Sequence, residues 1–136
     1  MASVIYDAES SVELRDPDAA AVTSTTTGTA IDFNLDAANG FAVILNVQSV
    51  DRTDADETYV LTIESLDSAG ANQFTQLTAP SITESGNYRF LIDGETAAKF
   101  DTDAAKIRAV MTIGGTSPSI KYGCWVMPAY GVSGRA

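Results

Sequence analysis

Carboxylates are the side chains of this sequence with most capacity for chemistry, and four of them gather in a short loop. The segment DRTDADE contains Asp51, Asp54, Asp56 and Glu57. Ca²⁺ takes about six to eight hard oxygen ligands, so a loop of this kind is a candidate cation site. The EF-hand spacing, with glycine at the sixth position and glutamate at the twelfth, is absent. The sequence therefore predicts a solvated loop tip without a bound metal.

Paired carboxylates could also act as the acid and base of a glycosidase. That reaction needs two carboxyl groups on opposite sides of a cleft, with the pKa of one raised. A charged loop tip that holds Asp54 and Glu57 supplies no cleft. The sequence contains no histidine, which excludes His-based triads and most catalytic zinc sites, and it contains no Gly-x-Ser-x-Gly motif. We therefore expect no enzymatic activity and no cofactor.

Cys124 is the single cysteine, so it cannot form a disulfide within the chain. It lies between Gly123 and Trp125 in a segment where apolar residues alternate. A small thiol behaves as an apolar side chain on the inner face of such a strand. We expect Cys124 to be structural.

The elements that would position these residues have the pattern of β-strands. Apolar and polar residues alternate with the period of two that a half-buried strand needs, most clearly in residues 105–113 and 120–127. Phe41–Val50 is apolar on both faces over its first half, which is typical of a strand inside its sheet. About eight short strands without a sustained helix predict an all-β fold, an antiparallel two-sheet β-sandwich of jelly-roll type.

The two clearest runs are expected to form a hairpin around Gly114–Ser119. In each run the apolar residues stand at alternate positions. A shift of the strand pairing by one residue would turn all of them outward, so this alternation sets the register. This register places Ala109 opposite Cys124 on the inner face. The acidic segment 51–57 is expected to connect a second hairpin in the same way.

The outer face of the first hairpin carries a candidate contact. The expected register places Arg108 beside Trp125, near enough for a cation–π interaction of roughly 0.5 to 1 kcal/mol. A large outward aromatic is covered by a neighbouring segment, buried in a subunit contact, or used as a sugar platform. We expect a homo-oligomer whose contact is formed by Val110, Trp125 and Met127.

The chain is expected to fold as one domain preceded by an arm. A length of 136 residues suits a single core. Residues 1–21 mix short apolar patches with acidic residues and contain Pro17, which interrupts regular structure. This arm is either a frayed end or edge strand, or a segment that docks on a partner. The residues that would dock are Val4, Ile5, Tyr6 and Leu14. The β-sandwich is expected over residues 22–136.

Net charge argues against two kinds of partner. The chain has 18 acidic and 8 basic residues and a formal charge of −10. Such a field repels the phosphates of nucleic acids and anionic lipid headgroups. No signal peptide and no membrane-spanning run is recognisable. We therefore expect synthesis in a cytosol, with neither nucleic acid nor membrane as a partner.

Four motifs follow one another in a recognisable order after the acidic loop. They are Tyr-x-Leu-x-Ile-Glu-Ser-x-Asp at Tyr59–Asp67, Phe74, Ser-Gly-x-Tyr-Arg at Ser85–Arg89, and Ile-Arg-Ala-Val-x-Thr-Ile-Gly-Gly-Thr-Ser-Pro-Ser-Ile-x-Tyr at Ile107–Tyr122. This pattern resembles small head-associated proteins of tailed bacteriophages, over roughly residues 29–127. The resemblance implies a capsid decoration or cement protein, an antiparallel β-sandwich that is often trimeric and binds the major capsid protein. It also implies a location on the capsid exterior of a virion assembled in the host cytoplasm, and no catalytic residue.

Two alternatives stay open from the sequence. A glycan-binding β-sandwich module would use Trp125, Tyr122 or Tyr88 as stacking platforms, although only Trp125 faces outward in the expected register. A neck or tail-tube subunit would be a different part of the same virion.

Overall fold

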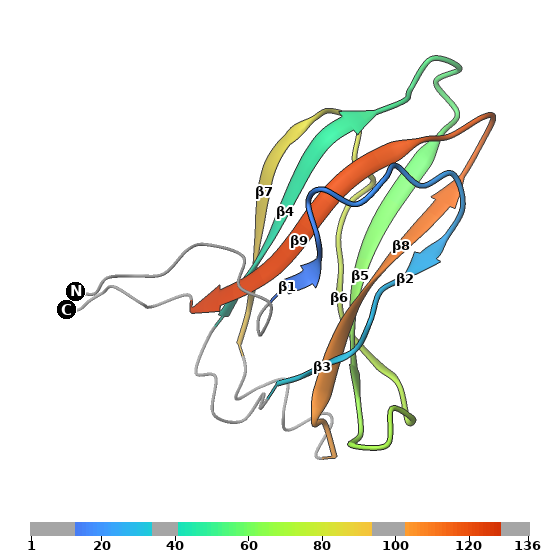
Figure 1. Cartoon of the computed structure of the whole chain (residues 1–136). Helices are drawn as coiled ribbons and strands as arrows, with labels where there is room; N and C mark the ends of the chain where they lie inside the picture. Colours follow the sequence, from blue (N-terminus) through green and yellow to red (C-terminus); the bar gives the residue numbers. More distant parts are fainter. Residues whose placement is uncertain (1–12, 34–40, 94–102, 129–136) are drawn as a thin grey trace.

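The structure is a computed structural model that describes residues 13–33, 41–93 and 103–128, shown in colour in Figure 1. These ranges contain nine β-strands and no helix. The strands are β1 (Glu13–Arg15), β2 (Thr26–Thr27), β3 (Ile31–Asp32), β4 (Phe41–Val50), β5 (Thr58–Leu66), β6 (Phe74–Thr78), β7 (Gly86–Ile92), β8 (Lys106–Gly114) and β9 (Ile120–Pro128). The all-β fold that the alternating pattern predicted is confirmed.

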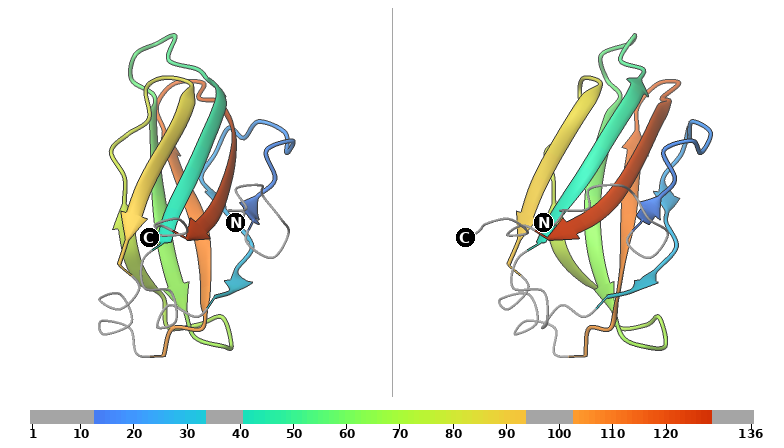
Figure 2. Two further views of the ribbon diagram at one scale, coloured as in Figure 1. Left: turned by 90° about the vertical axis from the view of Figure 1, so that its left-hand side faces the viewer. Right: turned by 60° about the vertical axis from the view of Figure 1, so that its left-hand side comes forward.

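The strands form two antiparallel sheets that pack face to face. One sheet has the order β1-β9-β4-β7, and the other has the order β2-β8-β5-β6 with β3 also paired to β8. Figure 2 shows β7, β4 and β9 in one layer, with β5 and β8 in the second layer. Because β2 and β3 share the same neighbour, they fill one strand position between them. Counted along the chain with β2 and β3 as one position, the sandwich has eight strand positions. In this count one sheet has the order 1-8-3-6 and the other has the order 2-7-4-5, which is the strand order of a jelly roll.

The core lies between the two sheets and is built from every second residue of the long strands. β4 lies between β9 and β7, so its expected interior place is confirmed. The inward faces predicted for β8 and β9 are also confirmed, because the alternate apolar residues expected on those faces are buried. Buried core residues of the four longest strands are Phe41, Val43, Leu45, Val47, Tyr59, Leu61, Ile63, Ile107, Ala109, Met111, Ile120, Tyr122, Cys124 and Val126.

Both expected hairpins are wrong. β8 and β9 lie in opposite sheets, and so do β4 and β5, which the segment 51–57 connects. Ala109 pairs with Ile63 of β5, and Cys124 pairs with Leu45 of β4. Alternation specifies which side chains face the core, whereas the partner strand depends on contacts distant in sequence. An arch across the sandwich buries the same side chains as a hairpin would, so the sequence pattern fits both.

The last part of the expected arm lies on the sandwich. β1 pairs with β9, and Leu14 is buried in the core. The guanidinium of Arg15 lies 4.4 Å from the ring centre of Tyr122, a cation–π contact that fixes β1 against β9. A Cβ at Gly123 would come within 2.7 Å of the Cα of Pro17, so this close approach requires glycine.

Candidate functional site

A shallow groove lies on the outer face of the four-stranded sheet. Its lining residues are Ile44, Asn87, Tyr88, Arg89, Trp125 and Met127. The strand register places Ile44 between Trp125 and Arg89, as direct cross-strand neighbours. Met127 and Leu91 lie in the next row of the same face, and Leu91 is 61% exposed. Apolar side chains gathered on an outer face make this groove a candidate contact surface.

Trp125 is the aromatic side chain that faces outward here. It is half-buried, and its Nε1 is buried without a hydrogen-bond acceptor among the described residues. Leaving such a donor unpaired costs about 1 to 3 kcal/mol. Tyr88 differs, because it packs against the core and its hydroxyl donates to the carbonyl of Glu84 at 2.6 Å. Within the described part of the chain, the indole N–H of Trp125 is therefore a buried donor without an acceptor.

The expected oligomer contact of Val110, Trp125 and Met127 is not one patch. Trp125 and Met127 share the groove, but Val110 lies on β8 in the opposite sheet. It is paired there with Thr62 and Thr27. This correction follows from the arch between β8 and β9, which places the outer faces of the two strands on opposite sides of the molecule.

The expected stacking of Arg108 on Trp125 is wrong for the same reason. Arg108 Nε donates to Glu64 Oε1 at 2.8 Å, and Arg108 Nη2 donates to Gln73 Oε1 at 3.1 Å. Gln73 Nε2 completes the triangle by donating to Glu64 Oε2 at 2.6 Å. These polar groups satisfy one another on the outer face of the five-stranded sheet, so they leave no free group for catalysis.

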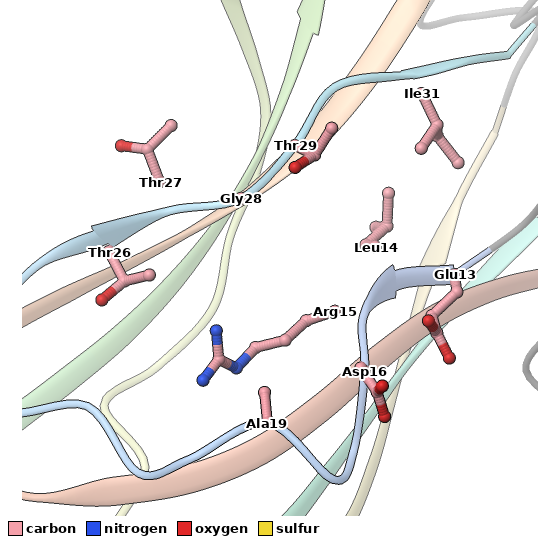
Figure 3. Close-up of a pocket in the computed structure, with 10 residues that line it drawn as sticks. All are labelled: Glu13, Leu14, Arg15, Asp16, Ala19, Thr26, Thr27, Gly28, Thr29 and Ile31. Carbon is pink, nitrogen blue, oxygen red and sulfur yellow. The ribbon is translucent and has the colours of Figure 1, made fainter. Parts of the chain in front are cut away.

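A pocket opens at the edge of the sandwich, between β1 and the segment that carries β2 and β3 (Figure 3). Arg15 extends into it, with its guanidinium between Ala19 and Thr26 in this view. Two of the five N–H donors of that guanidinium hold it in place, since Nη2 donates to the carbonyl of Ala20 at 2.8 Å and Nε donates to the carbonyl of Tyr122 at 3.1 Å. The shape of the pocket is therefore a consequence of how β1 docks.

The residues expected to dock on a partner fall into two groups. Val4, Ile5 and Tyr6 lie outside the described residues. Leu14 is 4% exposed and belongs to the core, so its side chain is not available to a partner. The edge strand that the sequence offered as one alternative for the arm is therefore present at Glu13–Arg15.

Cys124 is buried, and its inward orientation is confirmed. Burial raises the pKa of the Cys124 thiol to about 12, and burial also raises the pKa of the Tyr122 hydroxyl to about 12. The thiolate is the reactive form of cysteine, and it is scarce at neutral pH with such a pKa. Neither side chain is a candidate nucleophile.

The acidic segment is less solvated than the sequence predicted. Asp54 and Asp56 are exposed, but Glu57 is 0% exposed. The Thr116 side chain and backbone donate to Asp56 at 2.7 and 3.0 Å, and these hydrogen bonds lower the pKa of Asp56. The segment is therefore packed against the connection between β8 and β9.

The sequence did not point to Ile44, Asn87 or Arg89 as parts of the groove. A signal was present for Ile44, because β4 is apolar at even as well as odd positions over its first half. The sequence does not reveal which strands lie beside β4. The residues next to its buried and its outward apolar side chains therefore become known only with the sheet order.

Comparison with known proteins finds no family model that matches this sequence and no curated protein that matches it. In the part of the chain that the structure describes, no helix is long and apolar enough to cross a membrane. The fold, the groove and the sequence pattern are therefore the features that bear on function.

Proposed function

We propose that this protein is a non-enzymatic structural protein of a virion, a decoration or cement protein that binds the outer surface of a bacteriophage head and stabilises it. The observation that carries the proposal is the apolar groove around Trp125, on the outer face of the four-stranded sheet. Its lining combines two aromatic side chains, Trp125 and Tyr88, with an isoleucine, a methionine, an arginine and an asparagine, and aromatic residues, methionine and arginine are enriched in protein–protein contacts. The resemblance in sequence supports the major capsid protein as the partner.

The fold is compatible with this role without deciding it. Jelly-roll sandwiches occur in viral capsid proteins and in lectin domains, so the architecture supports both classes. The formal charge of −10 suits a protein on the exterior of a shell, away from packaged nucleic acid. The argument for a protein partner therefore depends on the groove.

Repetition of the contact would make a modest groove effective. One groove of this size binds weakly, but subunits linked as a trimer would bring several grooves to a repeating lattice. The second and third contacts then form at a high effective concentration, which can raise the overall affinity about 10²- to 10⁴-fold. A homotrimer is thus part of the proposal.

Glycan binding is the weaker alternative. Stacking platforms for sugars need outward aromatic rings, and the sequence offered Trp125, Tyr122 and Tyr88 as candidates. Tyr122 is 2% exposed, and Tyr88 packs against the core. Trp125 and the partly buried Tyr88 are the aromatic side chains that line the groove, and the Tyr88 hydroxyl is already bonded to the carbonyl of Glu84, so a protein partner is favoured.

The test measures capture of the protein by undecorated phage shells. Wild-type protein, Trp125→Ser and the control Val110→Ala are mixed with shells, and occupancy is compared after sedimentation. We expect Trp125→Ser to bind at least about tenfold more weakly, as hot-spot aromatics do, and Val110→Ala to bind like wild type. Equal occupancy of the folded Trp125→Ser protein and the wild type would reject the groove as the shell contact.

Two further measurements separate the competing roles. Mass spectrometry of purified particles gives the copy number relative to the major capsid protein, which is high for a decoration protein and low for a neck or tail-tube subunit. Light scattering gives the molar mass of wild type and Trp125→Ser in solution. A trimer that dissociates in Trp125→Ser while shell capture persists would assign the groove to self-association.

A further inference from the structure

The connection between β4 and β5 brings three carboxylates together at one end of the sandwich. Asp54, Asp56 and Glu57 each offer one oxygen, and these oxygens lie within 4.8 Å of one another. Clusters of exposed acids are common on protein surfaces, so proximity alone is no sign of a ligand. The burial and the hydrogen bonding of Glu57 distinguish this cluster.

Glu57 is a buried carboxylate with one unpaired oxygen. Its side chain is 0% exposed. Oε2 accepts a hydrogen bond from the backbone N–H of Asp54 at 3.0 Å. Oε1 is buried and has no hydrogen-bond partner among the described residues. A buried carboxyl oxygen without a partner is unfavourable, and a positively charged ligand beside it would remove that cost.

We propose that Asp54, Asp56 and Glu57 bind a divalent cation, with Ca²⁺ preferred over Mg²⁺. Oxygens on opposite sides of a Ca²⁺ ion, each about 2.3 to 2.6 Å from it, lie about 4.6 to 5.2 Å apart. The observed limit of 4.8 Å allows all three side chains to share one such ion. Mg²⁺ demands shorter bonds in a near-ideal octahedron, whereas Ca²⁺ accepts irregular sites completed by water.

The segment holds these carboxylates in place before any ion binds. Asp56 is fixed by the two hydrogen bonds from Thr116, and its oxygens keep further lone pairs for a metal. A Cβ at Gly115, which has φ +99°, would lie 2.6 Å from the carbonyl oxygen of Asp56. The connection between β8 and β9 therefore packs directly against the acidic segment. A bound ion would clamp the β4–β5 connection beside this contact.

Arg52 is the cation that could compete with a metal here. Its Nη1 donates to the backbone carbonyl of Glu57, and no hydrogen bond to the three carboxylates is found among the described residues. Its positive charge nevertheless acts on Asp56. Three carboxylates and one guanidinium leave a formal local charge of −2, which one divalent cation would neutralise. The site is independent of the groove around Trp125, which lies on another face.

The test titrates CaCl₂ into the chelator-treated full chain and follows the thermal midpoint and the heat of binding. We expect a saturable rise of the midpoint that EDTA reverses, and a weaker or absent rise with MgCl₂ at the same concentration. Asp54→Asn should weaken Ca²⁺ binding at least tenfold, and Glu57→Gln should abolish it. The control Asp18→Asn, an exposed acid outside the cluster, should bind like wild type.

Two results would overturn the proposal. One is a wild-type midpoint and heat unchanged by CaCl₂ up to millimolar concentrations. The other is an equal response in wild type and Asp54→Asn, which would show a general effect of ionic strength. Because the Asp54 side chain is exposed, Asp54→Asn should fold, and it decides the matter even if Glu57→Gln does not fold.

Discussion

The two sheets present the same kind of side chain to the core and different kinds to their surroundings. Both inner faces are apolar and buried. The outer face of the four-stranded sheet carries the groove around Trp125, with Leu91 exposed nearby. The outer face of the five-stranded sheet carries the triangle of Glu64, Arg108 and Gln73, and the ion pair of Lys106 with Asp32 at 2.8 Å.

This difference separates what stabilises the fold from what remains for a partner. On the five-stranded sheet these charged groups are paired with one another, although Phe74 of β6 is 39% exposed. On the four-stranded sheet, apolar area and the unpaired Nε1 of Trp125 remain without compensation in the described structure. In the proposed function the partner binds this face, and four measurements test what stabilises the two sheets and their connections.

The largest expected effect concerns Cys124, on the inner face of the four-stranded sheet. Burial and its raised pKa should protect the thiol in the native protein. For a domain with typical stability of at least about 5 kcal/mol, a thiol reagent should react at least about a thousandfold more slowly than with denatured protein. Rapid labelling of the native protein at pH 8 would contradict the inward orientation of that face.

Truncation of the core should destabilise the protein similarly from either sheet. Leu45→Ala on β4 and Leu61→Ala on β5 should each lower the free energy of unfolding by about 2 to 5 kcal/mol, because both side chains are 0% exposed. Urea denaturation measures the change, and Leu91→Ala on an outer face serves as the control with little loss. A small effect from only one sheet would show that the two inner faces do not share one core.

Loss of Arg108 should destabilise the five-stranded sheet through the charge that it leaves behind. Arg108→Met removes a partner of Glu64, whose side chain is 9% exposed, and should cost about 2 to 4 kcal/mol. The double variant Arg108→Met/Glu64→Met should recover part of this loss, because no charge then remains unpaired. Strictly additive losses in urea denaturation would mean that the pair is not coupled.

The smallest expected effect is the pH dependence of the turn between β5 and β6. Hydrogen bonds from the backbone N–H of Ala71 at 2.8 Å and of Ala69 at 3.0 Å lower the pKa of Asp67. The stabilisation is therefore present above the ordinary pKa of 3.8 and is lost as the pH falls through the lower folded value. Asp67→Asn should reduce the thermal midpoint slightly at pH 7 and flatten its decline below pH 4. An unchanged acid profile would contradict this role.

The sequence by itself determined the long strands, their inward faces and the sandwich. A period of two is a local property, and burial of the odd-numbered apolar residues in β8 follows from it whatever strand lies alongside. The inward place of Cys124 was predictable for the same reason. The outward place of Trp125 followed as well, because it is the next residue along the strand.

Only the tertiary structure decided which strands are neighbours. Backbone hydrogen bonds are chemically alike in every strand, so alternation cannot distinguish a hairpin from an arch that joins two sheets. That choice separated Val110 from Trp125, paired Arg108 with Glu64 and brought Ile44 and Arg89 beside the tryptophan. The arrangement of the strands also buried Glu57, because the two connections at that end of the sandwich pack together. This contact joins segments about 60 residues apart, and no local sequence pattern encodes it.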